Sequence, residues 1–285
     1  MARAKSHPGR RERRSPTPAA ARKRTAIRHL KQAVVEDRLV LLYQPIVSAR
    51  DSRVERAEAL LRWRKPKKER ETLTDLIWAA ERSPVIFKLE NWILDQSFQA
   101  ESAWREAGLT GLRVNVNLSA REFSRVDLVG RVTRRLEAAH LEPKDVGLEI
   151  TETSSMRRFD EVAGQIDLLM DKGIELWLDD FGTGHSSLEW LSHLPLHGVK
   201  IAATFVERLH DEKRCQVIVA RVIDLAHDFG LKVIAEGVET PRQRDFLADR
   251  GCDFLQGYLF YAALPAKRLP SALAAASGAL VGLSR

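Results

Sequence analysis

The sequence predicts an α/β fold, a modified (β/α)8 barrel of the TIM type whose first strand runs antiparallel to its neighbour. Eight short β-rich runs alternate with amphipathic stretches over roughly 250 residues, a length typical of this barrel. The first two runs, residues 39–47 and 54–63, are joined by a turn too short for a crossover helix, so we expect them to pair antiparallel. No glycine-rich phosphate turn follows the first run, which disfavours an open doubly wound sheet.

Six further strands and the helices between them follow from the same alternation. The strands are expected at residues 113–118, 146–151, 175–180, 198–202, 232–236 and 254–260. Apolar residues recur at i, i+3 and i+4 in three helical stretches, residues 122–139, 160–172 and 212–230. Residues 72–101 also have a helical pattern, which Pro84 interrupts because proline lacks the amide hydrogen that a helix interior needs.

The chain divides by charge into a basic arm and a nearly neutral body. Of the 46 basic and 39 acidic residues, nine and one lie in residues 1–25, which therefore carry +8, whereas the remainder carries −1. We expect residues 1–25 to form a disordered arm, residues 26–276 the barrel, and residues 277–285 a C-terminus that frays. The arm could bind nucleic acid or an anionic membrane, but no aromatic residue is interspersed among its charges, and we favour a solvated arm without such contacts.

The sequence is that expected of a cytoplasmic protein without a transmembrane segment. No apolar run approaches the roughly 18 residues that a membrane span needs, and the basic start lacks the apolar middle of a secretory leader. Cys215 and Cys252 stand apart, without a second cysteine or a histidine at metal-ligand spacing. This pattern excludes a disulfide framework and disfavours a zinc site.

Polar residues at the carboxyl ends of the expected strands mark the candidate site. In barrel enzymes this rim carries the active site, so ionisable groups there point to chemistry. Carboxylates, amides and a lysine gather in these positions: Glu58, Asn117, Glu149, Glu152, Asp179, Asp180, Lys200, Glu236 and Gln256. Oxygen ligands of this kind favour Mg²⁺ or Mn²⁺, and converging carboxylates repel one another unless a cation neutralises them.

The residues alone favour a metal-dependent phosphoryl hydrolase. The adjacent Asp179 and Asp180 could bridge two ions, and Lys200 would add a fixed positive charge near the phosphate. A metal-dependent lyase or an enolase-type barrel would use similar groups and stays open at this point. Two residues have simpler interpretations, because Asn117 could cap the following helix and Glu152 could be an exposed loop charge.

Residues 58–63 (EALLRW) resemble the signature of EAL domains, the bacterial cyclic di-GMP phosphodiesterases. The resemblance continues in family order through YQPIV (43–47), NVNLSAREF (115–123), LEITET (148–153), LDDFGTGHSSL (178–188), VKIAATFV (199–206), VIAEGVET (233–240) and QGYLF (256–260). Several motifs in order are specific, where a lone tripeptide would carry little weight. The resemblance covers roughly residues 35–265.

The resemblance implies hydrolysis of cyclic di-GMP to the linear dinucleotide pGpG, with two Mg²⁺ or Mn²⁺ ions as cofactors. It also implies a homodimer, because in the family the loop at residues 181–188 couples dimerisation to metal binding. The residues that match the ligands of one metal are Glu58, Asn117, Glu149 and Asp179. Those that match the ligands of the second metal and its activated water are Asp179, Asp180 and Glu236.

Other positions match family residues that act on the substrate or on the loop. Lys200 matches the essential lysine, so the resemblance implies a catalytic set of Lys200, Glu236 and Asp180. The positions that match substrate-contacting residues are Gln44, Leu61, Arg62 and Gln256. Glu152 matches a glutamate that braces the loop at residues 181–188.

The main departure from the family is Ala202, which stands where an aspartate usually follows Lys200 by two residues. Loss of that carboxylate near the second metal predicts metal binding or activity weaker by roughly 10–100-fold. Two hypotheses therefore stay open. The first is an active cyclic di-GMP phosphodiesterase of reduced rate, and the alternative is a catalytically impaired EAL domain that serves as a cyclic di-GMP receptor or a protein-interaction module. His185, in place of a loop tyrosine, is a milder departure.

Overall fold

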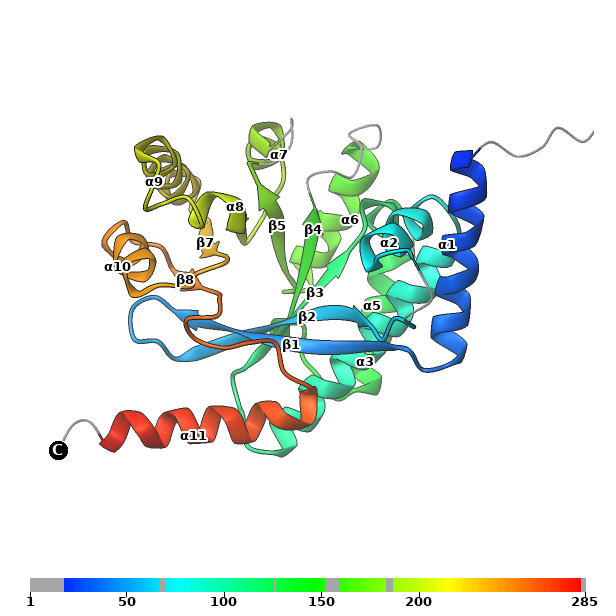
Figure 1. The fold of residues 1–285 in the computed structure, drawn as a ribbon, viewed down its shortest axis with the longest axis horizontal. Helices are drawn as coiled ribbons and strands as arrows, with labels where there is room; N and C mark the ends of the chain where they lie inside the picture. The colour runs from blue at the N-terminus through cyan, green and yellow to red at the C-terminus, as the bar shows by residue number, and fades with distance from the viewer. Residues whose placement is uncertain (1–17, 67–69, 126, 152–158, 183–186, 283–285) are drawn as a thin grey trace, which may run out of the picture.

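Eight strands close into a barrel that helices surround (Figure 1), which confirms the predicted fold class. The structure is a computed structural model and describes residues 18–66, 70–125, 127–151, 159–182 and 187–282. The strands follow one another around the barrel in chain order: β1 (Leu39–Ser48), β2 (Val54–Trp63), β3 (Arg113–Leu118), β4 (Val146–Thr151), β5 (Glu175–Phe181), β6 (Gly198–Ile201), β7 (Lys232–Ala235) and β8 (Phe254–Leu255).

The strand β1 runs antiparallel to both of its neighbours, β2 and β8, whereas the other neighbouring pairs are parallel. Leu39 pairs with Trp63 and Gln44 pairs with Glu58. The short turn between β1 and β2 reverses the chain with Ser52 at a φ of 58°. The predicted antiparallel first strand is therefore confirmed.

The last strand is shorter than the sequence predicted. We expected residues 254–260 to form it, but β8 ends at Leu255. The chain then turns against the loop that follows β7, because Val238 donates its amide hydrogen to the carbonyl of Gln256 and accepts one from Leu259. Gly257 makes this approach feasible, since a Cβ there would lie 2.0 Å from the carbonyl oxygen of Val238.

The helices alternate with the strands after β2. Their bounds are α1 (Pro18–Val35), α2 (Leu73–Glu81), α3 (Val85–Glu106), α4 (Ala120–Phe123), α5 (Leu128–Ala138), α6 (Phe159–Asp171), α7 (Ser187–His193), α8 (Ala203–Val206), α9 (Lys213–Asp228), α10 (Pro241–Asp249) and α11 (Leu269–Gly282), with 3-10 turns at Pro143–Asp145 and Ala266–Arg268. Within the described ranges, none of these helices combines the length and apolar character that crossing a membrane requires.

Local sequence signals explain where several helices begin. Thr72 precedes α2 and forms a capping box with Asp75, and Thr240 forms the same arrangement with Gln243 ahead of α10. Each hydroxyl accepts one of the amide hydrogens that a helix start leaves without a partner. Pro84 separates α2 from α3, as the sequence predicted.

Both ends of the chain are more helical than expected. We predicted a disordered arm up to residue 25, but α1 begins at Pro18, so residues 18–25 are helical; residues 1–17 lie outside the described ranges. Proline suits a first helical position, and the buried Ala26, Leu30 and Ala33 then anchor one face of α1. The alanine-rich helix α11 likewise runs to Gly282, beyond residue 277, where we expected fraying.

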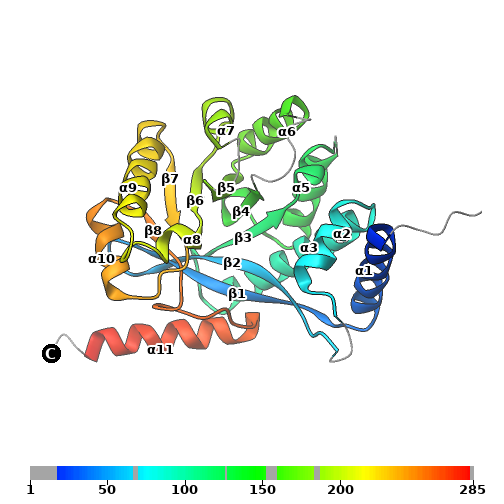
Figure 2. The same cartoon turned by 45° about the horizontal axis from the view of Figure 1, so that its top comes forward.

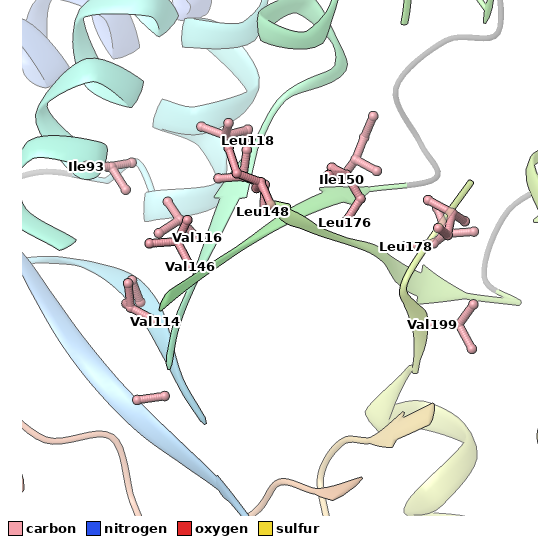
Figure 3. Packing of buried hydrophobic residues seen from close by; sticks show 14 of the residues in the cluster. Ile93, Val114, Val116, Leu118, Val146, Leu148, Ile150, Leu176, Leu178 and Val199 are labelled. Atoms are coloured by element: carbon pink, nitrogen blue, oxygen red, sulfur yellow. The ribbon is translucent and has the colours of Figure 1, made fainter. Parts of the chain in front are cut away.

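The largest core lies between the barrel and its surrounding helices. Alternate residues of β3, β4, β5 and β6 point outward and are buried, as Figure 3 shows for Val116, Leu148 and Leu178. Figure 2 shows that α11 lies apart from this layer of helices, on the β1 side of the barrel. The residues that point into the barrel are not all apolar. A small apolar cluster, which includes Trp177 and Ile234, lies at mid-height, and polar side chains lie above it. These polar side chains form the candidate site.

A carboxylate-rich site at the carboxyl ends of the strands

Lys200, on β6, lies at the centre of the site and is fully buried. Its Nζ faces four carboxylates from four other elements: Glu236 Oε1 at 2.6 Å, Glu149 Oε2 at 2.8 Å, Glu58 Oε2 at 3.1 Å and Asp179 Oδ1 at 3.3 Å. Glu58, Glu149 and Asp179 lie on β2, β4 and β5, and Glu236 directly follows β7, so the four carboxylates meet at one point inside the barrel mouth. The structure therefore brings together the strand-end residues that the sequence singled out.

Two amides complete the wall around Glu58. Asn117 Nδ2 donates to Glu58 Oε1 at 2.7 Å, and Gln256 Nε2 donates to Glu58 Oε2 at the same distance. Gln256 also lies 3.3 Å from Gln44 Oε1 on β1. The alternative interpretation of Asn117 as a helix cap is wrong, because Ser119 occupies the N-cap position of α4 and the Asn117 amide contacts Glu58 instead.

Negative charge exceeds positive charge in this buried cluster. Burial raises the pKa of Glu236 to about 8, and burial together with the neighbouring carboxylates raises the pKa of Glu149 and Asp179, against the attraction of Lys200. Burial alone would lower the pKa of Lys200, but the surrounding carboxylates raise it well above its ordinary value. Lys200 is therefore charged, and a divalent cation would relieve the remaining repulsion.

The donor set fits such a cation. Asp179, Asp180 and Glu236 each offer a carboxylate oxygen, and these oxygens lie within 4.8 Å of one another. All three are hard oxygen ligands, the type that Mg²⁺ and Mn²⁺ take in proteins.

A break in the β5 register explains how two consecutive aspartates serve one centre. The pairing of β5 with β6 shifts between Leu178 and Phe181, and Asp180 adopts a φ of 56° there. Such irregularities redirect a side chain, and aspartate tolerates the left-handed region better than most residues. The Asp180 amide donates to Asp179 Oδ1 at 2.9 Å, which holds the two residues in this arrangement.

A pocket of about 310 Å³ opens beside the cluster. Its lining includes the expected Gln44, Glu58, Asp179, Glu236 and Gln256, and seven residues that were not predicted: Leu60, Ala203, Glu207, Gly237, Glu239, Gly257 and Tyr258. Leu60 could have been found from strand alternation, because it lies two residues after Glu58 on the same face of β2. Glu207 and Glu239 lie in the segments that follow β6 and β7, where no periodic signal marks them.

Two expected substrate-contacting residues do not line this pocket. Leu61 points to the other face of β2 and packs against the outer core. Arg62 is half-buried farther along β2, and its Nη1 donates to the carbonyl of Leu61 at 2.9 Å. The expected loop glutamate, Glu152, and His185 lie outside the described residues.

Ala202 lies directly ahead of α8 with its methyl group buried. It therefore contributes no polar atom to the site, whereas its neighbour Ala203 lines the pocket. The loop after β7 comes close here, because a Cβ on Gly237 would lie 2.6 Å from the Cβ of Ala203.

The fold and the site together define an α/β barrel protein with an acidic centre of the kind that binds divalent cations. The model of the EAL domain family matches residues 27–263, and the chain belongs to this family. This result confirms the family that the sequence motifs indicated.

Named relatives agree with this assignment. The chain is 38% identical over 246 residues to the Cyclic di-GMP phosphodiesterase NbdA of Pseudomonas aeruginosa, covering 86% of this chain and 31% of NbdA. It is 33% identical over 238 residues to the Cyclic di-GMP phosphodiesterase PdeR of Escherichia coli, covering 84% of this chain and 36% of PdeR. The chain thus spans about a third of the length of these curated relatives.

A solved structure has the same fold. The structure described as "PaMucR Phosphodiesterase, c-di-GMP complex" superposes with a TM-score of 0.80 at 36% identity, covering 86% of this chain and 99% of that one. The barrel of this chain therefore has the same fold as a structure that is described as a phosphodiesterase in complex with c-di-GMP.

Proposed function

We propose that this chain is a cyclic di-GMP phosphodiesterase that hydrolyses its substrate to linear pGpG with two Mg²⁺ or Mn²⁺ ions. The observation that carries the proposal is the convergence of Glu58, Glu149, Asp179 and Glu236 on Lys200 at the mouth of the barrel. The names of NbdA and PdeR and the PaMucR complex support the same substrate.

The metal assignment follows the carboxylates. Glu58, Asn117, Glu149 and Asp179 would hold one ion, and Asp179, Asp180 and Glu236 would hold the other. When bound, such ions lower the pKa of a coordinated water and neutralise charge that develops on the phosphodiester.

The protein's own residues then have separable roles. Glu236, which bound cations would hold ionised, accepts a proton as water attacks phosphorus, while the bond from phosphorus to the ribose 3′ oxygen breaks and that oxygen takes up a proton. Lys200 holds a fixed positive charge beside the phosphodiester. Gln44 and Gln256 offer amides at the pocket wall, and Tyr258, 71% exposed, presents an aromatic ring next to them for a guanine base.

Ala202 favours a second candidate, a catalytically impaired EAL domain that binds cyclic di-GMP as a receptor or contacts a protein partner. Its buried methyl group supplies no metal ligand. The hydrolase and the receptor make opposite predictions for turnover and the same prediction for nucleotide binding, whereas a protein-interaction module predicts neither.

The deciding experiment incubates the purified protein with cyclic di-GMP and Mg²⁺ or Mn²⁺ and separates the nucleotides. Formation of pGpG by the wild type and not by Glu58→Ala would establish the hydrolase. Binding of cyclic di-GMP without product would establish the receptor instead. Absence of both binding and turnover would leave the protein-interaction module.

Three further expectations stay predictions. A homodimer should give twice the monomer mass by light scattering. The basic arm, residues 1–25, is expected to make no nucleic-acid or membrane contact; if it did, removal of residues 1–25 should abolish that binding along with its salt dependence. A cytoplasmic location would be checked by fractionating cells that produce the protein.

A further inference from the structure

Asn115, on β3, lies inside the barrel directly below the site and is fully buried. Its Nδ2 donates to Glu149 Oε1 at 2.8 Å, and its Oδ1 faces Arg56 Nη1 at 3.5 Å. The guanidinium can only donate a hydrogen bond, so the amide oxygen must face Arg56 and Nδ2 is left to donate to Glu149. The two charges therefore permit a single orientation of the Asn115 amide.

Arg56, on β2, is itself held in place from below. Its Nη1 forms an ion pair with Glu175 Oε2 at 2.5 Å, and its guanidinium stacks 4.7 Å from the centre of the Trp177 ring. Arg56 is 1% exposed, so its guanidinium is shielded from solvent. A continuous polar connection thus runs from Glu175 through Arg56 and Asn115 to Glu149.

The backbone beside Asn115 leaves space for the amide only because position 147 is a glycine. Asn115 pairs with Gly147 across the β3–β4 ladder. A Cβ on Gly147 would lie 2.8 Å from Asn115 Oδ1 and 3.3 Å from Trp177 Cδ1. A side chain at position 147 would therefore push the amide out of the position that it shares with Glu149.

Glu149 is fixed at both of its oxygens by this arrangement. Oε1 accepts from Asn115 and Oε2 accepts from Lys200 at 2.8 Å. Lys200 also contacts Glu58, Asp179 and Glu236, whereas Glu149 is the site residue to which the Asn115 side chain is bonded. Asn115 thus acts on the chemistry only through Glu149.

We propose that Asn115 is a positioning residue that sets the orientation in which Glu149 meets a metal ion, with Arg56 holding the amide and Gly147 leaving room for it. The inference rests on the proposed function, because it assigns Glu149 to a metal. Groups that orient a ligand in this way typically change metal affinity or activity by 10–100-fold when they are removed.

The test measures Mn²⁺ affinity by isothermal titration on chelator-stripped protein, well below the unfolding temperature of each variant. Asn115→Leu, which keeps the side-chain size and removes the donor, should weaken Mn²⁺ binding by roughly 10–100-fold. Gly147→Ala, which leaves every polar group in place, should weaken it in the same direction by displacing the amide. Asn91→Leu is the matched control, since Asn91 is a half-buried asparagine that bonds Arg131 on the outer helical layer, and its Mn²⁺ affinity should equal that of the wild type.

Wild-type Mn²⁺ affinity in both Asn115→Leu and Gly147→Ala would overturn the inference. If Asn115→Leu does not fold, Gly147→Ala decides alone, because it removes no polar group and adds a single methyl group beside the Asn115 amide. A wild type that binds Mn²⁺ without hydrolysing cyclic di-GMP would refute the hydrolase while the titrations still decide the role of Asn115. A wild type that binds no Mn²⁺ would overturn the proposed function and this inference together.

Discussion

The metal-free protein should lose stability as the pH rises through neutrality, because Glu236 holds a proton in the folded state. Its pKa is about 8 in the folded protein, because it is buried and lies beside other carboxylates, against an ordinary value of 4.5. The folded state therefore holds a proton that the unfolded chain releases. The stabilisation from this proton is fully present when the pH is below the pKa of Glu236 in the unfolded chain. It is lost as the pH rises towards the pKa of Glu236 in the folded protein.

The expected size follows from the linkage of one proton. Between the two pKa values the free energy of unfolding changes by about 1.36 kcal/mol per pH unit, so one group contributes about 2.7 kcal/mol between pH 5.5 and 7.5. For a domain of this size that corresponds to a fall in the unfolding midpoint of roughly 5–10 °C. Glu149 and Asp179 have raised pKa values and add in the same direction.

The assay is thermal or urea unfolding of chelator-treated protein at several pH values, with Glu236→Gln as the paired variant. The wild type should be destabilised with rising pH, the variant should be destabilised less, and saturating Mn²⁺ should flatten the wild-type curve by holding the carboxylates ionised. Equal pH slopes for the wild type and Glu236→Gln would show that Glu236 does not hold the additional proton of the folded state.

Three further changes test other parts of the structure. Lys200→Met should lower kcat by roughly 10²–10³ because it removes a fixed positive charge, and a rate within twofold of the wild type would contradict that role. Ala202→Asp should tighten Mn²⁺ binding by roughly 10-fold and raise kcat if the missing carboxylate limits the second metal, which titration and nucleotide assays would check. Gly198→Ala should destabilise the fold by about 1–3 kcal/mol, because a Cβ there would lie 2.4 Å from the Trp177 ring and 2.5 Å from the Lys232 carbonyl oxygen. Urea unfolding should show this loss, and an unchanged midpoint would argue against such tight packing at mid-barrel.

Much of the site could be predicted because strand ends are readable in the sequence. Glu149, Asp179 and Glu236 each follow a short apolar run, and parallel strands must bring such ends to one rim. The Leu60 and Leu61 positions show the limit of motif reasoning. A shift of one residue moves a side chain to the opposite face of a strand, so Leu60 reaches the pocket and Leu61 the outer core.

The inner support of the site could not be predicted in this way. Asn115 is in register with Glu58 and Gly147, yet its amide bonds Glu149, two residues farther along β4. Such a contact depends on how strands tilt and stagger in a closed barrel. The same is true of Arg56, whose charge would place it on the surface by any composition rule but which reaches Glu175 inside.

The antiparallel course of β1 also decides where the N-terminal helix meets the barrel. In a barrel of parallel strands the first strand starts at the floor, but here Leu39, the first residue of β1, pairs with Trp63 at the carboxyl end of β2. The chain therefore leaves α1 and enters the barrel on the side that carries the site, along the strand that then supplies Gln44. The strand β1 and its partner β2, which holds Glu58, are thus the first barrel elements that the chain forms after α1.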